Sequence, residues 1–312
     1  MFKLDNTRQI FGEALAEYGV KNKKVVVVTA DVSSSVMTTF FAQKNPERFF
    51  NVGIAEAGMV DTAVGFALSG FIPFANTFAA LLLRATEQIR TCVAYANTNV
   101  KIVGSFAGLS DAKDGATHHS IMDLAVFRAM PNMTVIVPSD SIEAKKMIPL
   151  MAELEGPAYI RISRAEMPII FDESHKVEIG KGVMVRDGND VSIIANGHLL
   201  SRALEAADKL SSQGVKARVV NMHTIKPLDM PLLRKCAQET GAIVTAEEHS
   251  IIGGLGSAVA EFLADENPVP VKRIGVADKF TESSKELDPL LDKYGMAVDD
   301  IVKAAQQAIK QK

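Results

Sequence analysis

Short apolar runs alternate with longer segments of helical spacing along most of the chain. Residues 24–29 read Lys-Val-Val-Val-Val-Thr, a β-branched run short enough for a strand that is buried on both faces. In residues 7–18 the apolar positions recur at the spacing of one helix face. Regular alternation of strands and helices predicts a parallel sheet with helices on both of its faces.

This pattern recurs through the first half of the chain. The expected strands span residues 24–29, 49–52, 71–74, 101–106, 134–137 and 158–162. The expected helices span residues 7–18, 36–43, 77–96, 123–129 and 141–154, and another carries Glu56 in its first turn and runs to about residue 70. Because ligands bind beyond the carboxyl ends of parallel strands, we expect the functional site at that edge of the sheet. The segments that follow such ends are Asp31, Glu56, residues 106–119 and Arg164.

Residues 168–190 interrupt the alternation with turn residues and two short β-like runs, so we place a domain linker there. The expected domains are residues 1–170 and 189–312, joined by residues 171–188. The second domain is the smaller, with about five strands, and includes expected strands at residues 191–195, 215–220, 242–246 and 269–276. Its expected helices are residues 198–211, 228–238 and 254–263, followed by a helical tail. The predicted fold class is α/β, with two consecutive parallel-sheet domains.

Composition narrows the class of protein. The residues are 47% hydrophobic and 23% charged, a composition typical of folded domains. With 312 residues, the chain is long enough for two domains. The net charge of −3, with scattered basic residues, argues against a nucleic-acid partner. No apolar run approaches spanning length, and residues 1–20 match neither a signal peptide nor an anchor. Cys92 and Cys236 are expected to be reduced core residues, so we expect a cytoplasmic protein without membrane contact.

Glu56 is the first candidate functional residue. It lies in the stretch Asn51-Val-Gly-Ile-Ala-Glu-Ala-Gly-Met59, between an expected strand and an expected helix. One interpretation is a first-turn acid that complements the helix dipole. The other is a carboxylate held at the edge of an apolar cleft for proton transfer. The pattern alone does not decide between them.

Two other motifs have alternative interpretations. Ile252-Gly-Gly-Leu-Gly256 lies between a strand and a helix, but its spacing does not fit the dinucleotide-binding motif. A glycine-rich turn that allows close strand–helix or subunit packing is the favoured interpretation. The pair His118–His119 has no third ligand at a suitable spacing, so we expect no metal site in this chain.

Six segments together resemble the transketolase family over essentially the whole chain. The resemblance is to the C-terminal half of a transketolase, in which a pyrimidine-binding domain precedes the C-terminal domain. The family's diphosphate-binding domain, with its Gly-Asp-Gly motif and downstream Asn, has no counterpart here, so we expect a separate partner chain. The segments are Val52-Gly-Ile-Ala-Glu56, Thr77-Phe-Ala-Ala, Arg84-Ala-Thr-Glu-Gln-Ile-Arg90, Asp114-Gly-Ala-Thr-His118, residues 131–140 and Glu247-Glu-His-Ser-Ile-Ile-Gly-Gly-Leu-Gly256.

The resemblance implies a site for thiamine diphosphate. A glutamate at the position of Glu56 hydrogen-bonds the aminopyrimidine ring of the coenzyme in this family and so promotes loss of the thiazolium proton. Phe78 corresponds to an aromatic residue of the pyrimidine pocket, which also includes the positions of Leu81 and Arg84. Asp31 matches a residue that helps to position the coenzyme at the subunit interface. Magnesium ligands are expected on the partner chain.

The resemblance also implies a sugar site. Asp114 matches an acid that contacts a substrate hydroxyl group, and His118 matches a histidine near the coenzyme and the sugar, which we assign a catalytic role with Glu56. Arg8, Ser35 and Arg164 match positions that bind a sugar phosphate, where a guanidinium fork suits phosphate oxygens.

Two positions depart from the family pattern. Leu81 stands where an aromatic ring usually stacks on the pyrimidine, which removes a preference of ~1 kcal/mol. Phe106 stands where a histidine usually contacts the phosphate, and phenylalanine cannot donate a hydrogen bond. We therefore expect the coenzyme to be retained and the sugar to differ from the standard pentose and hexose phosphates.

These observations lead to one main hypothesis and two alternatives. The main one is the C-terminal subunit of a split transketolase, active as a heterotetramer with an N-terminal subunit and also self-associating through the same interface. It would transfer a two-carbon ketol unit from a ketose phosphate to an aldose phosphate. The alternatives are a subunit similar to 1-deoxyxylulose-5-phosphate synthase and a relict subunit that binds the partner without catalysis.

Overall fold

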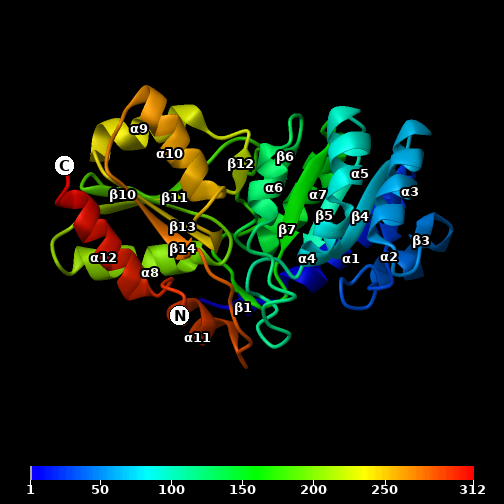
Figure 1. The fold of residues 1–312 in the computed structure, drawn as a ribbon, viewed down its shortest axis with the longest axis horizontal. Coiled ribbons are helices and arrows are strands. Elements are labelled where there is room, and N and C mark those ends of the chain that lie inside the picture. Colours follow the sequence, from blue (N-terminus) through cyan, green and yellow to red (C-terminus); the bar gives the residue numbers. More distant parts are fainter. Residues whose placement is uncertain (1) are drawn as a thin grey trace.

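The computed structural model describes residues 2–312 and contains two main sheets, which lie side by side (Figure 1). The first has seven strands in the order β12-β6-β7-β5-β4-β2-β3. All are parallel except β12, an antiparallel edge strand contributed by the second half of the chain. The strands are β2 (Val25–Thr29), β3 (Phe49–Asn51), β4 (Ile72–Phe78), β5 (Lys101–Ser105), β6 (Thr134–Ile136), β7 (Ala158–Ile162) and β12 (Thr224–Lys226).

Two sets of helices cover the faces of this sheet. On one face, Phe11 and Met147 pack with strand residues such as Val27. On the other, Met59 and Phe127 pack in a second cluster. The first set comprises α1 (Thr7–Lys21), α2 (Thr39–Lys44) and α7 (Ser141–Glu153), and the second α3 (Glu56–Leu68), α4 (Ala79–Leu82), η2 (Leu83–Ala85), α5 (Thr86–Gln88), η3 (Ile89–Tyr95) and α6 (Asp123–Ala129). Both faces are therefore buried, as a parallel sheet requires.

The second sheet has five strands in the order β14-β13-β10-β11-β9. Only its edge strand β9 is antiparallel. The strands are β9 (Val183–Arg186), β10 (Val191–Ala195), β11 (Ala217–Asn221), β13 (Ile243–Ser250) and β14 (Val271–Val276). The helices are α8 (Leu199–Ser211), α9 (Met230–Thr240), α10 (Leu255–Glu266), α11 (Leu287–Lys293) and α12 (Val298–Ile309). The short elements η1 (Pro46–Arg48), β1 (Leu4–Asp5) and β8 (Met167–Pro168) complete the fold, and β1 pairs with β8.

Strand pairing, hydrogen bonds and apolar packing also connect the two domains. Strand β12 pairs with β6, so the second half of the chain completes the first sheet. Buried Arg161 donates to both carboxylate oxygens of Asp123, at 2.7 and 2.9 Å, and to the carbonyl oxygen of Glu248 in β13 at 3.0 Å. One apolar cluster continues from the first sheet into α9 and α10. The two domains therefore share one hydrophobic core where they meet.

The architecture agrees with the predicted α/β class, with three differences. Each main sheet carries one antiparallel edge strand, which the prediction of parallel sheets did not include. Strand β9 lies within residues 171–188, so the end of the expected linker belongs to the second sheet. The single helix expected at residues 77–96 is wrong: β4 extends to Phe78, and the remainder is broken into short α, 3-10 and π segments.

Candidate active site

The predicted site residues gather along the carboxyl edge of the first sheet. Phe106 follows β5 directly, Phe78 ends β4, and Arg164 lies two residues beyond β7. Asp31 and Glu56 follow β2 and β3. Because β7, β5, β4, β2 and β3 are neighbours in this order, the side chains form a row along one edge, where ligands bind to such sheets.

Phe106 is the centre of the first group in this row. Its ring stacks on Phe78, with centroids 4.0 Å apart and an interplanar angle of 19°. The guanidinium carbons of Arg8 and Arg164 lie 5.0 and 5.1 Å from the Phe106 ring centroid. The backbone of Phe106 has φ +59°, a conformation that bulky residues rarely adopt and that is found mainly where surrounding structure enforces it. The enforced ring therefore brings two arginines from distant segments to one place.

The two arginines have different partners. Arg164 forms an ion pair with Asp111, whose side chain is fully buried, and its Nη1 also lies 3.4 Å from Asp114. Arg8 donates to the carbonyl oxygen of Ser35 at 2.5 Å. Burial lowers the pKa of the Arg8 guanidinium, and the nearby charge of Arg164 lowers it further. Two cations held this close together provide a receptor for an anion.

Other predicted residues lie at the margins of this group. His118 makes an edge contact with the Phe78 ring at 6.2 Å, and its Nδ1 lies 3.0 Å from the hydroxyl oxygen of Thr117. Leu81 lies in α4, half-buried. The carbonyl oxygen of Ser35 accepts the hydrogen bond from Arg8, which places Ser35 beside this group.

Glu56 forms a second group with Arg84. Glu56 begins α3, and only 2% of its surface is exposed. Its Oε2 atom lies 3.2 Å from Nη1 of Arg84, whose side chain is 64% exposed. Ile54, two residues earlier, is 75% exposed. A buried carboxylate thus lies behind an open surface that is partly apolar.

Asp31 follows β2 and is tied by a hydrogen bond to Asn51, which leads into the loop before Glu56. Its N–H donates to the side-chain oxygen of Asn51 at 2.9 Å, and the same oxygen accepts from the N–H of Gly53 at 3.1 Å. Asp31 has φ +58°, another enforced conformation. Asn51 therefore ties the end of β2 to the loop that leads to Glu56, and it was not singled out from the sequence.

The other sequence motifs have structural explanations. His119 is buried, with Nδ1 2.6 Å from the hydroxyl oxygen of Thr281 and Nε2 3.1 Å from the carbonyl oxygen of Asp111. In the glycine-rich turn, a Cβ atom on Gly254 would lie 2.1 Å from Oε2 of Glu247. That carboxylate accepts from the first N–H groups of α10, so the close strand–helix packing expected for this turn is confirmed.

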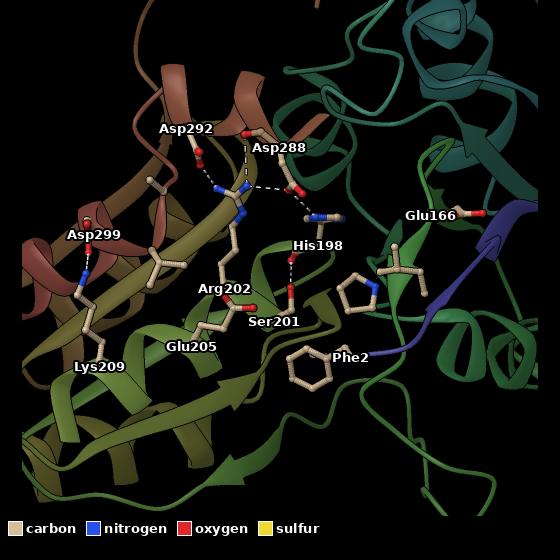
Figure 2. A pocket seen from close by; sticks show the side chains of 14 residues that line it. Phe2, Glu166, His198, Ser201, Arg202, Glu205, Lys209, Asp288, Asp292 and Asp299 are labelled. Carbon is tan, nitrogen blue, oxygen red and sulfur yellow. Dashed lines mark hydrogen bonds and ion pairs between the residues drawn. The ribbon is translucent and has the colours of Figure 1, made fainter. Parts of the chain in front are cut away.

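A larger cavity lies elsewhere, beside α8 and α11 (Figure 2). It measures about 690 Å³ and is lined by charged side chains. Figure 2 shows Arg202 between Asp288 and Asp292, and Lys209 directed at Asp299. Its cations are paired within its own wall, so cavity size alone is a poor guide to the active site of this molecule.

Asp111 is a residue of the candidate site that the sequence pattern did not single out. It follows the strand end by a few residues and precedes Asp114 on the same loop. Its position at the ligand-binding edge of the sheet was the available signal, but only the fold places it against Arg164. Among residues 2–312, no three His, Cys, Asp or Glu side chains are grouped as a metal site would require. No helix within this range is long and apolar enough to cross a membrane.

Family comparisons match both domains. Residues 5–169 match the transketolase pyrimidine-binding domain, and residues 180–301 match the transketolase C-terminal domain. The chain is 40% identical over 306 residues to the 6-deoxy-6-sulfo-D-fructose transketolase subunit SqwH of Clostridium sp. (strain MSTE9), covering 98% of this chain and 95% of that one. It is 37% identical over 305 residues to one of the subunits of the apulose-4-phosphate transketolase of Phocaeicola vulgatus, covering 97% of each.

A solved structure described as "Split gene transketolase, inactive beta4 tetramer" is similar over nearly its whole length. It shares 47% sequence identity with a TM-score of 0.92, and the match covers 98% of this chain and 99% of that one. Fold and sequence together define a transferase subunit of two α/β domains. The chain belongs to the transketolase family, and it contains the pyrimidine-binding and C-terminal domains of that family.

Proposed function

We propose that this chain is the C-terminal subunit of a two-chain transketolase that uses thiamine diphosphate. The observation that carries the proposal is the setting of Glu56, a buried carboxylate at the start of α3 and at the ligand-binding edge of the sheet. A dipole-complementing acid would not need burial, because such acids act at exposed helix ends. The two relatives that are split transketolase subunits match nearly full length.

The residues present fit the aminopyrimidine end of the coenzyme. Glu56 offers a carboxylate to a ring nitrogen, while Phe78 and Leu81 offer apolar surface to a flat ring. Arg84 and Asp31 complete the proposed pocket. When bound, the coenzyme supplies the nucleophilic carbon and the electron sink for cleavage between the second and third carbons of a ketose. The diphosphate and its Mg²⁺ are assigned to the N-terminal partner subunit.

The remaining residues act on the sugar. Arg8 and Arg164 bind the charged end of the substrate, and Asp114 accepts a hydrogen bond from a sugar hydroxyl group. His118, beside Phe78, holds or moves a proton near the reacting carbons. Holding the substrate at both ends lowers the entropic cost of reaching the reactive geometry. The two-carbon ketol unit then passes to an aldose acceptor.

Catalysis is proposed to require the partner chain. The surface around Ile54 and Arg84 is open, and the buried Glu56 lies behind it. We assign this surface to the N-terminal subunit in a heterotetramer and, when that subunit is absent, to other copies of this chain. The related structure described as an inactive β4 tetramer is consistent with such self-association.

The substrate is proposed to be a non-standard charged sugar. The two similar subunits are named for a sulfonated fructose and for apulose 4-phosphate. In this chain Phe106 is a buried ring beside the two arginines, and it supplies no hydrogen-bond donor to an anion. A different end group or a branched carbon chain would suit such a site better than a standard pentose phosphate.

The direct test is a reconstitution assay of both subunits with thiamine diphosphate and Mg²⁺. Ketol transfer from xylulose 5-phosphate or a modified ketose, with none from pyruvate, is the expected result. Turnover of pyruvate with glyceraldehyde 3-phosphate would instead indicate a deoxyxylulose-phosphate synthase. A complex that assembles but transfers nothing from any donor would indicate a relict subunit and contradict the proposal.

A further inference from the structure

We propose that the anion site formed by Arg8, Phe106 and Arg164 selects a sugar that ends in a sulfonate over one that ends in a phosphate. Asp111 is the residue that sets this preference. The inference rests on the proposed function and specifies the substrate class of the same site. It is carried by the charges and hydrogen-bond donors around the Phe106 ring.

Arg164 is already neutralised within the chain. The side chain of Asp111 is 0% exposed and forms an ion pair with Arg164, while Asp114 adds a second, half-exposed carboxylate at 3.4 Å. A buried carboxylate is strongly held to its charged partner, because separating them leaves an uncompensated charge. Arg164 therefore brings hydrogen-bond donors to the site but little net charge.

Unlike Arg164, Arg8 has no carboxylate partner within the described chain. Within residues 2–312 it forms no ion pair at 4.0 Å or less, and its hydrogen bond goes to the Ser35 carbonyl oxygen. Its buried Nε atom has no hydrogen-bond partner in this part of the chain. Arg8 is half-buried and its charge is not paired within the described chain, so its guanidinium is available to an external anion. Two guanidinium groups and the buried Asp111 leave at most one net positive charge.

The surrounding charges do not change this count. A cleft of about 560 Å³ opens beside Arg164, and its wall includes two lysines and two glutamates. The positive and negative charges of these four residues cancel. They are Lys113, Glu166, Lys285 and Glu286. The Phe106 ring, only 4% exposed, contacts both guanidinium groups and offers no donor to an oxyanion.

A site of this kind favours a monoanion. The cost of removing an ion from water rises with the square of its charge, whereas its attraction to a fixed charge rises only linearly. A sulfonate carries one negative charge, while a phosphate monoester carries about −1.5 to −2 at pH 7. With at most one net positive charge and no hydrogen-bond donor from Phe106, the second charge of a phosphate would be poorly compensated. The sulfonate has three oxygens for the two guanidinium forks and no second charge.

The test compares two ketose donors that differ only in the group on carbon 6. The reconstituted two-chain enzyme is assayed with 6-deoxy-6-sulfofructose and with fructose 6-phosphate, and the ratio of their kcat/KM values is measured. We expect the sulfonate to be favoured by about tenfold or more, the worth of one charged hydrogen bond. Asp111→Asn keeps the size of the side chain but adds one net positive charge, so it should shift the ratio toward phosphate by about tenfold.

Two further variants keep the test independent of folding. Phe106→His restores a donor and relieves the backbone, since histidine accepts positive φ more readily than phenylalanine, and it should also shift the ratio toward phosphate. Asp292→Asn removes an aspartate that contacts Arg202 in the second domain, and the ratio should stay unchanged. A wild-type preference for fructose 6-phosphate, or a ratio that neither site variant moves, would overturn the inference.

A binding measurement gives the answer without turnover. Arginine Nε–H resonances of the ¹⁵N-labelled chain are followed during titration with methanesulfonate and with methyl phosphate. The Arg8 resonance should shift at lower methanesulfonate concentration, and Asp111→Asn should reverse the order. Tighter methyl phosphate binding in the wild type would contradict the inference. The binding result does not depend on ketol transfer by the reconstituted enzyme. Absence of ketol transfer would refute the proposed function and leave the binding result unchanged.

Discussion

Two guanidinium groups share the ring of Phe106, although like charges repel. The ring face carries partial negative charge and attracts a nearby cation by roughly 0.5–1 kcal/mol at a partly exposed site. The contacts at 5.0 and 5.1 Å therefore offset part of the repulsion between Arg8 and Arg164. The ion pair between Asp111 and Arg164 offsets more of it. In the proposed site, Arg8 would supply affinity for the substrate, and the Asp111–Arg164 pair would stabilise the site.

Arg8→Ala tests this separation. We expect KM for anionic donors to rise by an amount worth about 2 kcal/mol, because a charged hydrogen bond to the substrate is lost. The free energy of unfolding should stay nearly constant, since no carboxylate of the described chain loses its partner. The measurement compares the KM for an anionic donor with the KM for the uncharged acceptor glycolaldehyde, which has no anionic group for Arg8 to bind. Equal losses with both substrates would show that Arg8 is structural, and Arg234→Ala is the remote control.

His119 makes folding stability depend on pH. Burial lowers its pKa to about 4, and the neighbouring His118 lowers it in the same direction. In the unfolded chain the pKa is about 6.5, so the unfolded state binds more protons between these values. The stability contribution is complete above pH 6.5 and is lost as pH falls toward 4.

His119→Gln should flatten this dependence. Between pH 7 and pH 5 the wild type should lose about 2 kcal/mol more unfolding free energy than the variant. Urea unfolding of both proteins at the two pH values measures the difference. Parallel losses in the two proteins would mean that the histidine is protonated in the folded state at pH 5.

Among the elements, α10 has an unusual start. Its first N–H groups, from Leu255 and Gly256, donate to the Glu247 carboxylate of β13 at 2.7 and 2.8 Å. Gly254 has no Cβ atom, which leaves the space that this carboxylate needs. The glycine-rich turn therefore serves an internal anion, a side chain of the same chain, at a helix N-terminus.

Glu247→Ala should destabilise the fold by about 2–3 kcal/mol, because two buried N–H groups lose their acceptor. Glu266→Ala is the matched control, since its exposed pair with Arg234 is worth at most about 1 kcal/mol. Denaturant unfolding of the two variants decides the question. A loss for Glu247→Ala no greater than that of the control would mean that water replaces the carboxylate.

Local pattern predicted most elements, and long-range pairing explains what it did not. Apolar runs such as residues 158–162 became buried strands, because their burial depends on the run itself. The pattern predicted a strand that ends at Phe74 and a helix that begins at residue 77, yet β4 continues to Phe78 between β2 and β5. Hydrogen bonds on both sides of a central strand outweigh local propensity. Strand ends predicted part of the candidate site, and the family resemblance supplied the rest, including Arg8 and Phe78. Neither predicted the Asp111–Arg164 pair, because no spacing in the sequence encodes it.

At the scale of the whole molecule, the two domains form one folding unit. Strand β12 belongs by sequence to the second domain but pairs with β6 in the first sheet. Arg161 links Asp123 to the backbone of Glu248 across the joint, and the apolar cluster is continuous there. The second domain therefore supports the carboxyl edge of the first sheet, where the proposed sugar site lies.

Calorimetry of the whole chain should accordingly show one unfolding transition, with calorimetric and van't Hoff enthalpies that agree. Residues 1–170 expressed alone should aggregate, because the edge of β6 and the apolar surface of the joint would be exposed. Two separate transitions, or a stable monomeric fragment, would contradict a shared core.

The most direct test of the proposed function is exchange of the thiazolium proton with solvent in the reconstituted complex. Glu56→Gln keeps a hydrogen-bonding side chain beside Arg84, so folding and coenzyme affinity should change little. Exchange should slow by about 10² or more, the usual contribution of a positioned acid or base. Glu13→Gln, on exposed α1 surface, should have no effect. Exchange by Glu56→Gln at close to the wild-type rate would contradict the assignment of Glu56 and, with it, the proposed coenzyme site.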